Sequence, residues 1–173
     1  MNTVTTIRVC FVCTGNICRS PTAEGVFKQL AKDAGLAHAF HVESAGIGGW
    51  HVGERPDSRT LHAAKAQGFH LDSRAQQFKA RDFDRFDVVV GMDRSHVDAL
   101  TALATNDAMR NKISLARDHV PNGPRDLDVP DPYYDRGSEA FDEVVVLCRE
   151  ACAGLLAELR ANHGLGYSAT QLR

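Results

Sequence analysis

The sequence lacks a long apolar run, an excess of charge of either sign and the cysteine content of a disulfide framework. No apolar stretch approaches the ~18 residues that a membrane-spanning helix needs, and the segment from Met1 to Thr6 lacks the basic start of a signal peptide. The 20 Lys and Arg side chains face 22 Asp and Glu, so a net charge of -2 argues against nucleic acid or an anionic membrane as a general partner. Five cysteines in 173 residues are an odd number and too few for a disulfide scaffold. We therefore expect a cytoplasmic protein with reduced cysteines.

Strand and helix patterns alternate along the chain and indicate an α/β protein. Short runs of β-branched and apolar residues predict strands at 7–12, 40–44, 87–91 and 112–116. Helical spacing of apolar residues predicts helices at 20–34, 58–67, 92–103 and 138–162. Such alternation predicts a three-layer sandwich, with a four-stranded parallel sheet between helices on both faces, as a single domain over residues 1–173. The segment 117–135 is a long loop, and loops of this length are usually functional.

The loop between the first strand and the first helix pairs a cysteine with an arginine. Cys13 follows the strand, at the edge where open α/β sheets bind their ligands, and Arg19 stands at the end of the loop. The residues between them can curl so that their N–H groups meet at a tetrahedral dianion, helped by the backbone freedom of Gly15 and Asn16. Arg19 can clamp two oxygens of that anion, and the same positive field stabilises a Cys13 thiolate. The loop therefore predicts covalent phosphoryl transfer.

The helix that follows this loop is expected to start at its Ser-Pro pair, with Ser20 as N-cap and Pro21 at the first helical position. A helix N-terminus adds to an anion site. A zinc site on Cys10 and Cys13 would need a second Cys or His pair at finger spacing, which the sequence lacks. No metal or other cofactor is expected.

The segment from Val12 to Pro21 resembles the phosphate-binding loop of the low-molecular-weight protein tyrosine phosphatases. The resemblance continues in order through 44–46, 50–53, 57–59, 83–87, 92–93 and 131–134, and so covers essentially the whole chain. It implies hydrolysis of phosphotyrosine, an aryl phosphate monoester, through a phosphocysteine on Cys13, with Arg19 and the loop amides holding the phosphate. The substrate-binding residues would be Thr14, Gly15, Asn16, Ile17, Cys18, Ser20, Trp50, Tyr133 and Tyr134.

A phosphatase of this kind needs a carboxyl group that protonates the leaving phenolate and then activates water. The long loop offers four, namely Asp126, Asp128, Asp131 and Asp135. Pro132 holds Asp131 extended and stiffens the loop, which favours Asp131 slightly. The resemblance assigns the acid and base to Asp131.

Residues around the cleft also follow from the resemblance. Trp50, the single tryptophan, and Tyr133 would form its walls, where their rings could stack on a substrate phenol. Ser20 would donate a hydrogen bond to the Cys13 thiolate. The supporting residues would be Asn16, Ser20, Ser44 and Asp93. The sequence departs from the common family pattern at Ile47, Ser73, Gln76 and His96, and it assigns no role to His51 or His96.

Cys18 has two interpretations. It can be a small apolar filler, or, as the resemblance suggests, a redox residue that resolves an oxidised Cys13 as a disulfide. Cys148 and Cys152 fall on the apolar stripe of the last helix, which indicates core packing.

Two alternative functions remain beside the phosphatase. An arsenate reductase shares the fold and loop but needs a further cysteine pair near the loop, and residues 80–100 contain no cysteine. A phosphotyrosine-binding module without catalysis would need neither Cys13 nor Asp131. The expected partners are phosphotyrosine-containing proteins, a tyrosine kinase among them, with inorganic phosphate as product inhibitor.

Overall fold

The computed structural model describes residues 5–166. The chain folds around a central parallel sheet. Its strands are β1 (Ile7–Cys13), β2 (Phe40–Gly46), β3 (Val88–Gly91) and β4 (Ile113–Leu115), in the order β2-β1-β3-β4. The central strand β1 pairs Cys13 with Gly46 of β2 and Val12 with Gly91 of β3. The expected α/β architecture around a four-stranded parallel sheet is confirmed.

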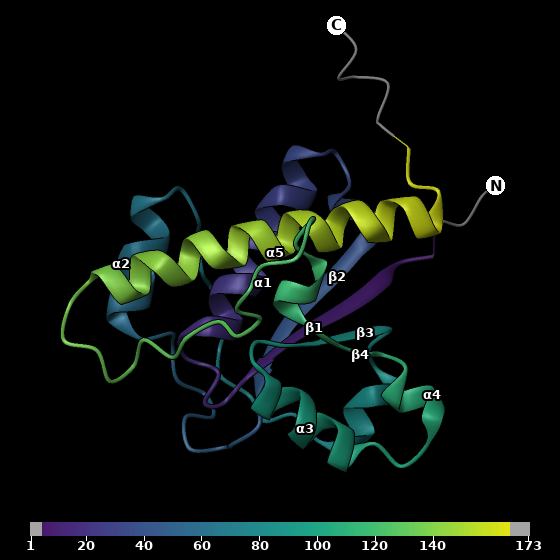
Figure 1. The fold of residues 1–173 in the computed structure, drawn as a ribbon, viewed down its shortest axis with the longest axis horizontal. Coiled ribbons are helices and arrows are strands. Elements are labelled where there is room, and N and C mark those ends of the chain that lie inside the picture. The colour runs from purple at the N-terminus through teal and green to yellow at the C-terminus, as the bar shows by residue number, and fades with distance from the viewer. Residues whose placement is uncertain (1–4, 167–173) are drawn as a thin grey trace, which may run out of the picture.

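Helices cover both faces of this sheet (Figure 1). Helices α1 (Arg19–Asp33), α2 (Ser58–Ala66) and α5 (Glu139–His163) pack on one face, and α3 (Arg94–Leu103) and the short α4 (Asp107–Arg110) lie on the other. Residues 5–166 also form three 3-10 turns: η1 (Ala37–Ala39), η2 (Ala80–Asp84) and η3 (Ala116–His119). Among residues 5–166, no helix is long and apolar enough to cross a membrane.

Side chains of β1 alternate between the two layers of the core. Val9, Phe11 and Cys13 belong to the larger apolar cluster with α1 and α5, whereas Cys10 and Val12 belong to the smaller cluster with α3. Period-2 alternation of a strand buried on both faces explains this division. It places Cys13 at the carboxyl end of β1, on the face that α1 covers.

The start of α1 differs from the expectation. The helix begins at Arg19 with Cys18 in the N-cap position, so the prediction that Ser20 caps it is wrong. The Ser20 hydroxyl lies instead 2.9 Å from the Cys13 sulfur. The Ser20 hydroxyl, which by local propensity would bind the backbone N–H groups of the helix start, thus contacts the Cys13 side chain instead. The short elements α4, η1, η2 and η3 were not predicted either.

Candidate active site

The loop that joins β1 to α1 turns its carbonyl groups outward. Backbone N–H groups from neighbouring segments donate to three of these carbonyls, at N···O distances of 2.8 to 2.9 Å. The bonds run from Ile47 to Cys13, from Gly48 to Thr14 and from Asp57 to Ile17. For the N–H groups of residues 15–18, by contrast, no acceptor is recorded among residues 5–166. A row of N–H groups left free in this way forms a concave site for an anion.

Asn16 supports the loop from inside. Its φ of 57° lies in the left-handed region, which asparagine tolerates better than most residues. Its Nδ2 donates to the hydroxyls of Ser20 (2.8 Å) and Ser44 (2.9 Å), and its Oδ1 accepts from the Gln76 N–H (2.9 Å). Ser44 in turn donates to the buried Glu24 carboxyl at 2.5 Å. The side chains of Asn16, Ser20 and Ser44 therefore lie behind the loop and do not line the cleft.

The Cys13 sulfur lies at the base of the cleft with a hydroxyl beside it. Only 3% of Cys13 is exposed, and its Sγ is 2.9 Å from Ser20 Oγ. Because Asn16 Nδ2 already donates to this oxygen, the Ser20 hydroxyl keeps its own proton for the sulfur or for the Ala45 carbonyl at 3.3 Å. A thiolate at Cys13 would therefore find a donor in place.

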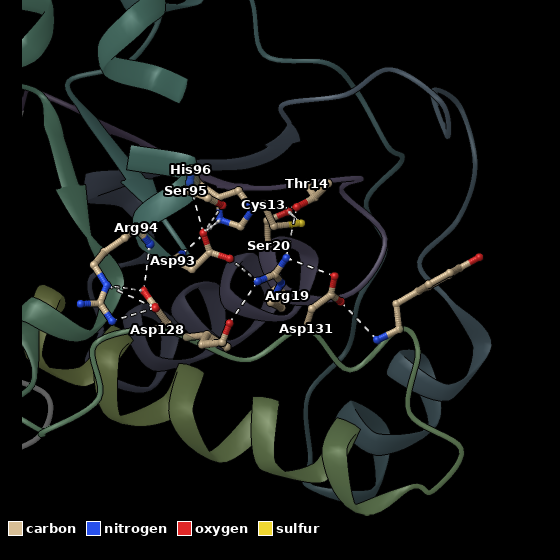
Figure 2. A network of polar contacts seen from close by, with 12 residues as sticks. Cys13, Thr14, Arg19, Ser20, Asp93, Arg94, Ser95, His96, Asp128 and Asp131 are labelled. Atoms are coloured by element: carbon tan, nitrogen blue, oxygen red, sulfur yellow. Dashed lines mark hydrogen bonds and ion pairs between the residues drawn. The ribbon is translucent and has the colours of Figure 1, made fainter. Parts of the chain in front are cut away.

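Arg19 is a buried cation held from several sides, as Figure 2 shows. Its Nη1 donates to Asp93 Oδ2 at 2.6 Å and to the Val129 carbonyl at 3.0 Å. Its Nη2 donates to Thr14 Oγ1 at 3.2 Å and lies 3.5 Å from Asp131 Oδ2. The guanidinium plane is thus oriented by the protein, with Nη2 at the side of the cleft.

Asp93 ends the loop after β3 and caps α3. Its Oδ1 accepts from the His96 N–H at 3.2 Å and from the Ser95 hydroxyl at 2.5 Å. Burial acts to raise the pKa of Asp93, but the hydrogen bond from Ser95 and the Arg19 guanidinium outweigh it and lower the pKa. Asp93 therefore stays ionised and serves as the counter-ion of Arg19.

His96 completes this helix start and was missed by the sequence analysis. Its Nδ1 accepts from the Asp93 N–H at 3.1 Å, and its Nε2 lies 2.8 Å from Thr14 Oγ1. Burial lowers the pKa of His96 to about 4, so the ring is neutral near pH 7. Its position three residues after a capping aspartate was the available signal.

Among the four candidate aspartates, Asp131 is the one that lines the cleft. Its carboxyl is 39% exposed, and its Oδ1 accepts from the Tyr133 N–H at 3.1 Å. Asp128 is bound at 3.0 to 3.2 Å to the side chain of Arg94, the first residue of α3 (Figure 2). Asp128 does not line the cleft. The geometry thus separates these two carboxyl groups, which sequence physics alone barely distinguished.

Arg59 anchors the loop that carries Asp131. Its guanidinium donates to the carbonyls of Tyr133 (3.2 Å) and Asp135 (3.3 Å). The α2 N-cap, Asp57, binds the Arg59 side chain at 2.8 and 3.0 Å, and the Asp57 N–H donates to the Ile17 carbonyl. The N-terminus of α2 therefore connects the acid loop to the phosphate loop.

The cleft itself has a volume of about 330 Å³ and aromatic walls. Trp50 is 72% exposed, Tyr134 86% and Tyr133 39%, so these rings are not core residues. His51, to which the sequence analysis gave no role, also lines the cleft, and its position next to Trp50 was the available signal. The lining residues are Cys13, Thr14, Gly15, Ile17, Cys18, Arg19, Trp50, His51, Asp131, Tyr133 and Tyr134.

All five cysteines are free thiols and buried. Cys18 lines the cleft beside Cys13, and burial raises its pKa to about 12. Cys148 and Cys152 lie in the larger core cluster, as expected. Within residues 5–166 there is neither an exposed cysteine pair nor a group of three His, Cys, Asp or Glu side chains placed to hold a metal ion.

Comparison with known proteins agrees with this geometry. The sequence model of the family described as "Low molecular weight phosphotyrosine protein phosphatase" matches residues 8–164. A low molecular weight protein-tyrosine-phosphatase of Streptomyces coelicolor is 48% identical over 156 residues, which are 90% of this chain and 94% of that protein. YfkJ of Bacillus subtilis, named as a phosphatase of the same kind, is 40% identical over 89% of this chain and 96% of its own length.

Solved structures give the same result. The crystal structure of a protein tyrosine phosphatase from Entamoeba histolytica with Hepes in the active site has a TM-score of 0.86 at 32% identity, over 91% of this chain and 99% of that one. A Drosophila arginine phosphatase has a TM-score of 0.82 at 30% identity, over 89% and 98% of the two chains.

The fold and the anion-binding loop thus define a phosphatase of the α/β class. The chain belongs to the low molecular weight phosphotyrosine protein phosphatase family and is a hydrolase of that family. The resemblance drawn from the sequence motifs is confirmed.

The buried neutral His96 predicts a dependence of stability on pH. The unfolded chain takes up a proton at this residue near pH 6.5, whereas the folded protein does so near pH 4. The free energy of unfolding should therefore decrease as the pH falls through this window. Denaturant unfolding at several pH values should show this decrease in the wild type and a smaller one in His96→Asn. An equal decrease in both proteins would show that another group is responsible.

Proposed function

We propose that this protein hydrolyses phosphotyrosine in proteins through a phosphocysteine intermediate. The Cys13 thiolate attacks phosphorus while Asp131 gives its proton to the departing phenolate oxygen. Asp131 then takes a proton from water, which attacks phosphorus and releases phosphate and the thiolate. The observation that carries the proposal is one cleft that brings together the Cys13 sulfur, the Arg19 guanidinium and the Asp131 carboxyl.

The negative charge of the phosphoryl oxygens in the transition state is met by groups already in place. The outward carbonyls leave the N–H groups of residues 15–18 for the phosphoryl oxygens, and Arg19 adds a fixed cation. Donors held in advance stabilise a transition state more than mobile ones, because they need no reorganisation during the reaction. Ser20 stabilises the sulfur when it leaves in the second step.

The substrate class follows from the walls of the cleft. Trp50 and Tyr133 expose aromatic faces beside the phosphate loop, and such faces suit a phenyl ring. We therefore propose phosphotyrosine-containing proteins as substrates, a tyrosine kinase among them, and inorganic phosphate as a product inhibitor. Because one structural relative is named an arginine phosphatase, a phosphoarginine peptide is the informative comparison substrate. The five free thiols fit a reducing, cytoplasmic compartment.

Replacing Cys13 tests the mechanism directly. Cys13→Ser should abolish hydrolysis of a phosphotyrosine peptide, because the hydroxyl is a far weaker nucleophile than the thiolate. Arg19→Lys should lose much of the activity as well, since an ammonium cannot reproduce a planar guanidinium whose Nη1 donates to Asp93 and the Val129 carbonyl while its Nη2 lies at the cleft. Steady-state rates with chelator present measure both losses. Substantial turnover by purified Cys13→Ser would exclude the phosphocysteine route.

The role of Asp131 is tested by the leaving group. Asp131→Asn should slow hydrolysis of esters of weakly acidic phenols by roughly 10²–10⁴-fold, because these need protonation, and should affect strongly acidic phenols much less. The matched control is Asp128→Asn, which removes a carboxyl bound to Arg94 outside the cleft and should leave the leaving-group dependence unchanged. If Asp131→Asn slowed both kinds of ester equally, the carboxyl would have a structural role instead.

Oxidation tests the second interpretation of Cys18. Peroxide would convert the Cys13 thiolate to a sulfenic acid, and the Cys18 sulfur could then displace water to form a disulfide that thiols reduce. The raised pKa of Cys18 leaves little thiolate, so this step should be slow and should compete with further oxidation. After peroxide and then reductant, the wild type should recover more activity than Cys18→Ser. Equal recovery, without a Cys13–Cys18 peptide in mass spectra, would make Cys18 a packing residue.

A further inference from the structure

The Thr14 hydroxyl occupies an unusual position between two donors. Thr14 is the residue after Cys13, and its side chain lines the cleft. Its Oγ1 lies 2.8 Å from His96 Nε2 and 3.2 Å from Arg19 Nη2. Figure 2 shows the His96 ring and the Arg19 guanidinium approaching this part of the loop from β3–α3 and from α1.

The tautomer of His96 follows from the hydrogen bond at its other ring nitrogen, Nδ1. The Asp93 backbone N–H donates to His96 Nδ1 at 3.1 Å. Asp93 Oδ1 lies 3.2 Å from the same nitrogen but is not hydrogen-bonded to it, so Nδ1 carries a lone pair. In a neutral imidazole the proton is then on Nε2. Burial keeps the ring neutral near pH 7 by lowering its pKa to about 4, against the opposing influence of Asp93. His96 Nε2–H therefore donates to Thr14 Oγ1.

The hydrogen bonds that the Thr14 hydroxyl accepts determine where its O–H bond can point. A hydroxyl oxygen accepts two hydrogen bonds and donates one. Both acceptor positions are filled, one by His96 Nε2–H and one by Arg19 Nη2–H, which is always protonated. In the part of the chain that the structure describes, no acceptor is recorded for the hydroxyl proton. The O–H bond must therefore point away from both donors, and the side chain is exposed to the cleft.

We propose that the Thr14 hydroxyl donates a hydrogen bond to a phosphoryl oxygen in the loop, and that His96 is the positioning residue that orients it. The inference rests on the proposed phosphatase function of the same cleft. Arg19 alone would leave one acceptor position open, and the hydroxyl could then rotate. With His96 in place the loop gains a side-chain donor of fixed direction, beside the backbone donors, at the residue next to the sulfur.

Two pairs of variants separate this role from a structural one. Thr14→Val removes the donor and keeps the branched shape, and Thr14→Ser keeps the hydroxyl as its matched control. His96→Asn retains an oxygen near the Nδ1 position for the Asp93 N–H but places no atom at the Nε2 position. The two measurements are the calorimetric affinity for inorganic phosphate and kcat/KM for an aryl phosphate, in wild type, single variants and the Thr14→Val/His96→Asn double variant.

Thr14→Val should weaken phosphate binding and lower kcat/KM by roughly 10- to 100-fold, the range for a hydrogen bond to a charged group. Thr14→Ser keeps the hydroxyl and should therefore retain much more of the phosphate affinity and of kcat/KM than Thr14→Val. His96→Asn should reduce both quantities in the wild-type background but change them little in the Thr14→Val background, because its action passes through the hydroxyl. Unfolding in denaturant at neutral pH verifies that each variant is folded.

Two results would overturn the proposal. Phosphate affinity of Thr14→Val equal to that of the wild type would show that the hydroxyl does not contact the anion. An equal loss from His96→Asn with and without the Thr14 hydroxyl would show that His96 acts only through the Asp93 cap. Phosphate binding by calorimetry needs no turnover, so these outcomes are distinguishable from a failure of the Cys13 mechanism, which the Cys13→Ser rates report. Should His96→Asn not fold, the comparison of Thr14→Val with Thr14→Ser still decides whether the hydroxyl binds the anion.

Discussion

The burial of the Arg19 guanidinium is the constraint on which the rest of the site depends. An ion withdrawn from water loses several kcal/mol of solvation unless partners replace the water. Here the replacements come from segments far apart in sequence, namely Thr14 in the loop, Asp93 before α3 and the Val129 carbonyl. The Arg19 guanidinium therefore links three loop segments, those of Thr14, Asp93 and Val129. Removing a partner would leave charge uncompensated in the interior, which explains why these segments must fold together for the cleft to exist.

The site also depends on the parallel sheet, because the carboxyl ends of its strands all lie at one edge. The segments after β1, β2 and β3 bring the phosphate loop, Trp50 and Asp93 to that edge, and the long connection after β4 brings Asp131. Parallel strands joined by helices produce this convergence without any special sequence in the loops. The loops are then fixed to one another by the N–H groups that hold the outward carbonyls and by the α2 N-terminus, where Arg59 holds the acid loop.

Features encoded within a short segment could be predicted from the sequence, and those that depend on distant partners could not. The spacing of Cys13 and Arg19, with a helix start after them, is local information. The N-cap prediction for Ser20 was wrong because Cys13 and Asn16 compete with the backbone for its hydroxyl, whereas the contact with Cys13 was expected from the family resemblance. Local physics favoured Asp131 among the loop aspartates only slightly and the family resemblance made the choice, whereas the contact that holds Asp128 on Arg94 is visible only in the structure. The position of His96 three residues after Asp93 could have indicated its part in the cap, but its contact with Thr14 joins residues 82 positions apart, which no local pattern reveals.

The start of α3 supports the phosphate loop through two different contacts. Asp93 offers a charge to Arg19, while His96, neutral and buried, offers a donor to Thr14. The reciprocal cap, in which each residue binds the backbone N–H of the other, holds both side chains in place. A disturbance of this cap would therefore shift both Arg19 and the Thr14 hydroxyl, whereas a change at Thr14 removes the hydroxyl and one acceptor of Arg19 but leaves the contact between Asp93 and Arg19 in place. The capped start of α3 does not line the cleft, yet it holds in place two side chains that bind the irregular phosphate loop and Arg19.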